Sequence, residues 1–143
     1  MIIQFIYFSI FTQMQGLTLS SSFDWSVKLW NPKVSNECFL SFDSAEDYVY
    51  DVGFNRTNPA LFASVDGEGY IDLWDLEGDL EVPLLHYKSG NNSLNKLKWN
   101  KDGSKMIVGD AVGNVNLYGL EKRVCFIYYF LVFFEFLLYN FRD

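Results

Sequence analysis

The sequence repeats one nine-residue pattern at intervals of 44 residues. The three copies read SFDWSVKLW, DGEGYIDLW and DAVGNVNLY, and they end in Trp30, Trp74 and Tyr118. In each copy a turn-forming patch is followed by residues that alternate between two faces, and a period of two is typical of a β-strand. A fixed interval of this length predicts a chain built from stacked copies of one structural unit.

Further strand-like runs lie at matching positions around each copy, with Phe54 and Trp99 in register. The runs cover 17–22, 60–65 and 105–109 directly before the repeated turn, 48–55 and 94–100 further upstream, and 37–42 and 82–87 after the first two copies. Each unit therefore has about four short strands, as in a propeller blade. We predict an all-β fold of about two and a half four-stranded blades, in which an aliphatic face meets one neighbour and an aromatic face the other.

Longer stretches of the sequence carry a family resemblance. They are SSFDWSVKLW (21–30), DYVYDV (47–52), NPALFASVDGEGYIDLW (58–74), EVP (81–83) and the run from LNKLKW to GDAVGNVNLY (94–118). These stretches resemble the WD-repeat family, and within it the C-terminal propeller of the cytoplasmic dynein intermediate chains. The resemblance covers about residues 17–122 and identifies this region as part of a WD-repeat β-propeller.

The same resemblance implies a function. It implies a non-catalytic scaffold that docks on the dynein heavy chain in microtubule-based movement, in the cytoplasm and on the cytoskeleton, without a cofactor. The family's long N-terminal region, which would bind light chains and dynactin, has no counterpart in this chain. Those partners are therefore not expected here.

Several positions are expected to hold the repeat together. They are Asp24, Trp30, Trp74, Tyr118, Phe54 and Trp99. The family pattern places an acid six residues before the Trp, which Asp24 satisfies, whereas the other copies have Glu68 and Val112 there. The histidine that begins the family's hydrogen-bond network is missing, because the single histidine, His86, lies in a different predicted strand.

One residue of the first copy, Trp25, is not explained by the repeat, since the other copies have Gly69 and Gly113 at its position. Its turn belongs to a propeller rim, where an exposed aromatic side chain is suited to partner binding. The alternative is that Trp25 packs over Tyr48 or a neighbouring loop. We expect a partner-binding surface on this rim, formed by Trp25, Asp47, Tyr48 and Glu68.

Composition argues against several other classes of protein. With 11 basic and 18 acidic residues, a net charge of −7 and no Lys/Arg cluster, the chain is poorly suited to nucleic acid. Cys38 and Cys125 lack the spacing of a zinc site or a disulfide framework. His86 is the single imidazole and the aspartates form no calcium loop, so we predict no catalytic, metal or cofactor site and no enzyme activity.

The two ends differ in composition from the middle. We expect residues 1–16, an apolar head, to lie outside the domain, and residues 123–143, an apolar aromatic tail, to be non-native or membrane-associating. Both ends are rich in residues that AT-rich non-coding DNA tends to encode, which favours the first interpretation. The alternative is a tail-anchored membrane protein, although 124–139 as a helix would reach roughly 24 Å against a bilayer core of about 30 Å.

The number of blades has a consequence of its own. A closed propeller needs about four to eight blades, more than this sequence supplies. Sheets without neighbours leave apolar faces and strand edges uncovered. We therefore expect the chain by itself to fold poorly or to associate.

Overall fold

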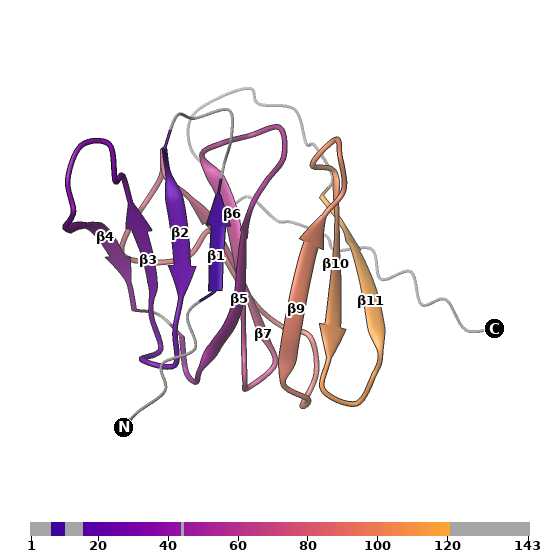
Figure 1. The fold of residues 1–143 in the computed structure, drawn as a ribbon. Coiled ribbons are helices and arrows are strands. Elements are labelled where there is room, and N and C mark those ends of the chain that lie inside the picture. The colour runs from indigo at the N-terminus through magenta and orange to yellow at the C-terminus, as the bar shows by residue number, and fades with distance from the viewer. Residues whose placement is uncertain (1–6, 11–15, 44, 121–143) are drawn as a thin grey trace.

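Antiparallel sheets make up the described part of the molecule. A computed structural model describes residues 7–10, 16–43 and 45–120, and within these ranges the chain forms eleven strands and no helix. The strands make three sheets, two with four strands and one with three, which stand side by side in chain order (Figure 1). The predicted all-β fragment of about two and a half four-stranded blades is confirmed.

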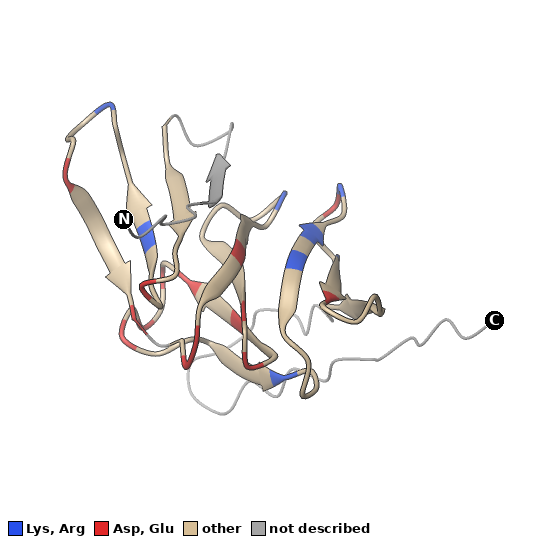
Figure 2. Cartoon of the chain, turned by 60° about the horizontal axis from the view of Figure 1, so that its bottom comes forward, with Lys and Arg blue, Asp and Glu red and all other residues tan. Residues whose placement is uncertain are grey.

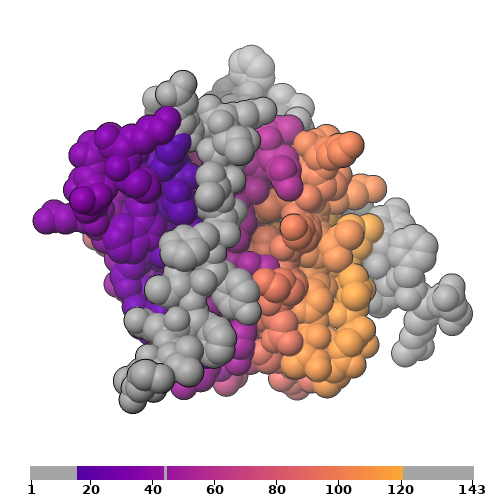
Figure 3. Space-filling model, in the orientation of Figure 1, coloured from indigo at the N-terminus to yellow at the C-terminus, as the bar shows by residue number. Residues whose placement is uncertain are grey.

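Each sheet is a meander in which consecutive strands pair antiparallel. The first sheet contains β1 (Tyr7–Ile10), β2 (Thr18–Ser21), β3 (Val27–Trp30) and β4 (Cys38–Phe42). The second contains β5 (Val49–Phe54), β6 (Leu61–Asp66), β7 (Tyr70–Asp75) and β8 (Leu85–Lys88). The third contains β9 (Leu94–Trp99), β10 (Lys105–Asp110) and β11 (Val115–Gly119). The space-filling view shows the same order from indigo to yellow (Figure 3).

Strand β1 lies within residues 1–16, the segment that we expected outside the domain. It pairs with β2 over four residues, from Tyr7 opposite Ser21 to Ile10 opposite Thr18. The backbone of these four residues therefore belongs to the first sheet. The tail, 123–143, lies outside the described residues.

The first interface lies between the first and second sheets and is apolar. Leu19, Val27, Leu29 and Phe42 of the first sheet pack against Val49, Val52, Phe54, Phe62 and Trp74 of the second. Aromatic rings from the two sheets pack edge to face across this interface: the centroids of Phe42 and Trp74 are 4.8 Å apart, with an interplanar angle of 60°. Such edge-to-face pairs add to the stabilisation from burial alone.

A second interface of the same kind lies between the second and third sheets. Ala63, Val65, Ile71 and Leu73 pack against Leu94, Leu97, Trp99, Met106, Val108 and Tyr118. In both interfaces the aliphatic face of one repeated strand meets the face that carries the aromatic residue of the next. The predicted packing of aliphatic against aromatic faces is therefore confirmed.

The third sheet has an uncovered aliphatic face. Val115 is 68% exposed, whereas Val27 and Ile71, at the same position of the repeat, are 2% and 0% exposed. Ile107 on the neighbouring strand is 46% exposed, whereas its equivalent Ala63 is fully buried. The same positions are buried where a following sheet is present and exposed where the described residues provide none.

Candidate protein-interaction rim

The repeated turns gather on one rim of the stacked sheets. The turns 22–26, 66–70 and 110–114 lie along the lower edge in Figure 1, together with the connections 43–48 and 88–93. Backbone hydrogen bonds join neighbouring segments, from Gly67 N to Tyr48 O at 3.0 Å and from Ser89 N to Gly69 O at 2.9 Å. We call these five segments the turn rim.

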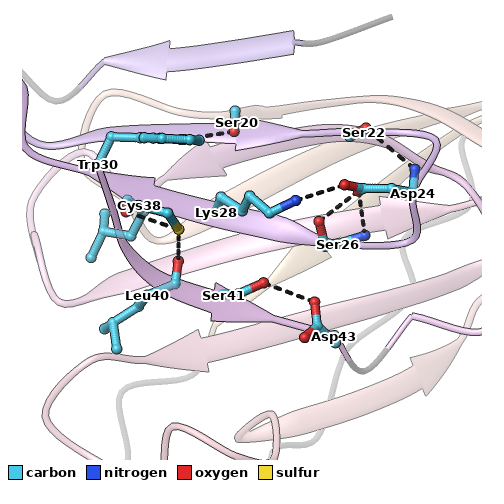
Figure 4. A network of polar contacts seen from close by, with 11 residues as sticks. Ser20, Ser22, Asp24, Ser26, Lys28, Trp30, Cys38, Leu40, Ser41 and Asp43 are labelled. Atoms are coloured by element: carbon cyan, nitrogen blue, oxygen red, sulfur yellow. Dashed lines mark hydrogen bonds and ion pairs between the residues drawn. The ribbon is translucent and has the colours of Figure 1, made fainter. Parts of the chain in front are cut away.

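Asp24 organises the first of these turns (Figure 4). Its Oδ1 accepts hydrogen bonds from the amide and the hydroxyl of Ser26, at 3.2 and 2.6 Å, and its Oδ2 lies 2.6 Å from Lys28 Nζ. Partial burial by itself would raise the pKa of Asp24. Hydrogen bonds from Lys28 and Ser26, together with the lysine charge, outweigh burial and lower this pKa below its usual value of 3.8.

The other two turns use an acid two residues earlier than the position of the acid in the family pattern. Asp66 Oδ1 accepts from the Tyr70 amide at 2.8 Å, and Asp110 Oδ1 accepts from the Asn114 amide at 2.7 Å. These acids open the second and third nine-residue copies, where the first copy has Ser22.

Asp66 and Asp110 differ in their surroundings. Asp66 is 3% exposed, and burial raises its pKa above 3.8, with further contributions from the charges of Asp72 and Asp47. Asp110 is close to solvent, and its slight burial by itself would raise its pKa. Hydrogen bonds from Asn114, Asn92 and Val112 outweigh burial and lower this pKa below 3.8. Equivalent turn acids therefore have pKa shifts of opposite sign.

Trp25 has a backbone conformation that normally requires glycine. Its φ is +68°, and the glycines at the same position of the other turns, Gly69 and Gly113, have φ of +89° and +93°. An L-residue in the left-handed region costs about 1–2 kcal/mol. The side chain is nevertheless 50% exposed. The turn geometry therefore explains the glycines but not the tryptophan.

Tyr48 and Asp47 lie beside this turn. The ring that contacts Tyr48 is that of Phe23, with centroids 4.8 Å apart, and Phe23 also makes an edge contact with Tyr50 at 5.5 Å. Tyr48 remains 43% exposed. The carboxylate of Asp47 lies against the Cα of Gly67, where an added Cβ would clash with it.

Glu68 lies in the turn between β6 and β7, and its side chain reaches toward Lys88 at the end of β8. Its carboxylate is 3.9 Å from Lys88 Nζ, and this ammonium group lies 4.6 Å from the centre of the Tyr70 ring. Tyr70 stacks on His86 at 4.1 Å, and His86 Nδ1 lies 2.6 Å from Asp72 Oδ1. The single histidine of the chain thus joins β7 to β8.

The remaining repeat residues lie in or next to the sheet interfaces. Trp30 is partly exposed and donates from its indole nitrogen to Ser20 Oγ at 2.8 Å, whereas Trp74 and Tyr118 are 2% and 1% exposed. Burial raises the pKa of Tyr118 above 10.0. Phe54 packs in the first interface, and Trp99 donates to Gly53 O at 3.0 Å across the second.

The turn rim is acidic. Its described residues include seven acids, which are Asp24, Asp43, Glu46, Asp47, Asp66, Glu68 and Asp110, and one basic residue, Lys88. Figure 2 brings this rim forward and shows acidic residues on its turns. A negative potential of this kind attracts basic groups of a partner and accelerates their encounter.

The described residues show neither a metal cluster nor a membrane-spanning helix. Over residues 7–10, 16–43 and 45–120, no three or more His, Cys, Asp or Glu side chains come together as a metal site. In the same ranges the chain has no helix of the length and apolarity needed to cross a bilayer. The proposed anchor, 124–139, lies outside the described residues.

The repeat and the fold together define a class of protein. Antiparallel sheets of three or four strands that stack at a 44-residue repeat, with Trp or Tyr near the end of the repeated strand, are those of a WD-repeat β-propeller. No family model matches the chain. Over 109 residues it is 39% identical to the cytoplasmic dynein 1 intermediate chain of Drosophila melanogaster. The match covers 76% of this chain and 16% of the relative's length, so the chain is related to a dynein intermediate chain over a small part of that protein.

Proposed function

We propose that this chain is part of a non-catalytic scaffold of a dynein complex and that its turn rim docks on the dynein heavy chain. The proposal places the protein in the cytoplasm, associated with microtubules. It is supported by the 39% identity to a cytoplasmic dynein intermediate chain. Stacked sheets with exposed turns are suited to binding other proteins, since repeat folds present extended surfaces of this kind.

The observation that carries the docking proposal is the exposure of large aromatic side chains on the turn rim. Trp25 and Tyr48 are 50% and 43% exposed although the chain has apolar cores in which rings of this size are buried. Trp and Tyr are the residues that most often dominate the binding energy of protein interfaces. Asp47 and Glu68 lie on the same rim and would contribute charge to the interface.

The test is co-precipitation of the heavy chain with a tagged, full-length protein that contains this segment. We expect the double variant Trp25→Ser and Tyr48→Ser to recover about tenfold less heavy chain, the loss typical of removing one strong interface residue. Phe39→Ser is the matched control, because Phe39 is 66% exposed on β4 and lies away from the turn rim. Equal recovery with all proteins would refute docking through this rim.

A further inference from the structure

The turn rim carries an exposed aromatic patch, which we define as Phe23, Trp25 and Tyr48. Phe23 packs against Tyr48 with ring centroids 4.8 Å apart, and Trp25 lies in the same turn as Phe23. The backbone amide of Val49, next to Tyr48, donates to Ser22 O at 3.2 Å, which holds the two segments together. The rings of Phe23 and Tyr48 thus meet at the surface, and the exposed Trp25 follows Phe23 by two residues in the same turn.

The fold itself does not require an aromatic residue in this turn. The other two turns have glycine at the position of Trp25, with the same sign of φ. The hydrogen bonds that hold the first turn come from Ser22, Asp24 and Ser26 rather than from Trp25. A large side chain that is left exposed on a residue with a disfavoured backbone conformation indicates a role in binding.

The charges around the patch indicate the chemistry of its partner. The connection beside Tyr48 contributes Asp43, Glu46 and Asp47 and contains no basic residue among its described positions. The nearby bases are already engaged, because Lys28 contacts Asp24 at 2.6 Å and Lys88 lies 3.9 Å from Glu68. Aromatic faces next to carboxylates attract lysine and arginine through the ring quadrupole and through direct charge pairing.

We propose that the aromatic patch binds a lysine- or arginine-bearing segment of a partner protein, with a cationic side chain set against Trp25 and Tyr48 and paired with Asp47. The proposal rests on the proposed function in that it uses the same surface, the turn rim. It does not require the partner to be the heavy chain. It goes further by assigning the binding chemistry to specific rings and a carboxylate. Specificity then comes from the cation, and affinity from the burial of the rings.

The probe for this proposal is a fluorescent peptide in which arginine alternates with serine, titrated with the 143-residue chain and followed by anisotropy. The matched probe has citrulline at each arginine, which keeps the shape and removes the charge. We expect the arginine peptide to bind about tenfold more tightly, and its binding to weaken as salt is raised, because exposed charge pairs are screened.

The decisive variant is Trp25→Gly. Glycine is the residue that the other turns use, so the midpoint of urea unfolding should stay the same or rise while peptide affinity falls about tenfold. Asp47→Asn should weaken binding of the arginine peptide and leave the citrulline peptide unchanged. Phe39→Gly removes a ring from β4 that is 66% exposed, against 50% for Trp25, and should change neither binding nor the salt dependence.

The outcomes separate this proposal from the proposed function. Equal binding of the two peptides, or full affinity in Trp25→Gly, would overturn the cation-binding patch whatever the heavy chain does. If the peptide results hold but the rim variants still recover heavy chain, the patch stands and the partner is another protein with a basic segment. Loss of heavy chain without discrimination between the peptides would support docking through the rim by contacts other than a cation.

Discussion

At the scale of single residues, the repeat places chemically similar acids in dissimilar surroundings. Asp66 and Asp110 both fix the turn between the second and third strands of their sheets. Asp66 is 3% exposed and lies near the charges of Asp72 and Asp47, so its ionised form is disfavoured in the folded state. Asp110 is stabilised as a carboxylate by Asn114, despite a small opposing effect of burial.

This contrast predicts opposite pH dependences for two equivalent substitutions. The folded-state pKa of Asp66 is raised above 3.8, so its favourable contribution is present below that pH and is lost as the pH rises through the folded pKa. We therefore expect Asp66→Asn, which cannot ionise, to be more stable than the parent at neutral pH. The gain in the free energy of unfolding should shrink as the pH falls toward 3.8.

Asp110→Asn is the matched comparison. The pKa of Asp110 is lowered, so its contribution is present above 3.8 and is lost as the pH falls through the folded pKa. This variant should be slightly less stable than the parent at neutral pH. Urea unfolding of both variants across the acid range measures the two slopes, and slopes of the same sign would contradict the assignment.

The role of a single residue could be predicted from the sequence where the aligned copies of the repeat differ at its position. Trp25 stood out because Gly69 and Gly113 occupy its position, and the structure gives all three a positive φ. The raised pKa of Asp66 was not predicted, because it follows from burial in the fold and from the charges of Asp72 and Asp47 rather than from the local sequence. The rim contacts of Tyr48 with Phe23 likewise join segments of different sheets.

At the scale of strands and sheets, polar side chains fasten the second sheet to the third. Asn55 is 2% exposed, and its amide nitrogen donates to Gly103 O at 2.8 Å, in the turn between β9 and β10. Its Oδ1 accepts from the amides of Thr57 and Asn58, each at 3.0 Å. Thr57 Oγ1 adds a hydrogen bond to Asp102 O at 3.1 Å. One asparagine thus holds both its own turn and the neighbouring sheet.

We expect Asn55→Ala to lower the free energy of unfolding by about 1–3 kcal/mol, the cost of leaving buried backbone groups without partners. Asn100→Ala is the control at the same position of the next unit, where the side chain bonds to Asp102, Ser104 and Lys105, all within its own turn. It should cost about 1 kcal/mol or less. Urea unfolding measures both, and equal losses would show that the contact to Gly103 contributes little.

The strands themselves were largely predictable, and the contacts between sheets were not. Alternation over 94–100 and 105–109 predicted β9 and β10 to within a residue, since side-chain period two is a local property. The role of Asn55 was not predictable, because Gly103 lies 48 residues away. Strand β1 was missed because the apolar head shows no alternation that distinguishes it from its surroundings.

At the scale of the whole molecule, the third sheet has one face that no other sheet covers within the described residues. In the third sheet Ile107, Leu117 and Val115 lie at positions that are buried in the two preceding sheets, where the next sheet covers them. Strand β11 is also the last strand of its sheet, whereas β3 and β7 pair with a fourth strand. Within residues 7–10, 16–43 and 45–120, apolar side chains and an unpaired strand edge are thus exposed together, which favours association with another sheet.

We therefore expect the 143-residue chain to self-associate at micromolar concentration, and Val115→Lys combined with Ile107→Lys to weaken association by about tenfold or more. Lysine on the exposed face would have to be desolvated on contact, whereas folding of the chain leaves it in water. Val34→Lys is the matched control, because Val34 is 77% exposed in the connection between β3 and β4, away from this face. Sedimentation velocity over a concentration series measures the effect. A parent chain that sediments as a sharp monomer at every concentration would contradict the prediction, and equal weakening by Val34→Lys would assign association to overall charge rather than to the uncovered face of the third sheet.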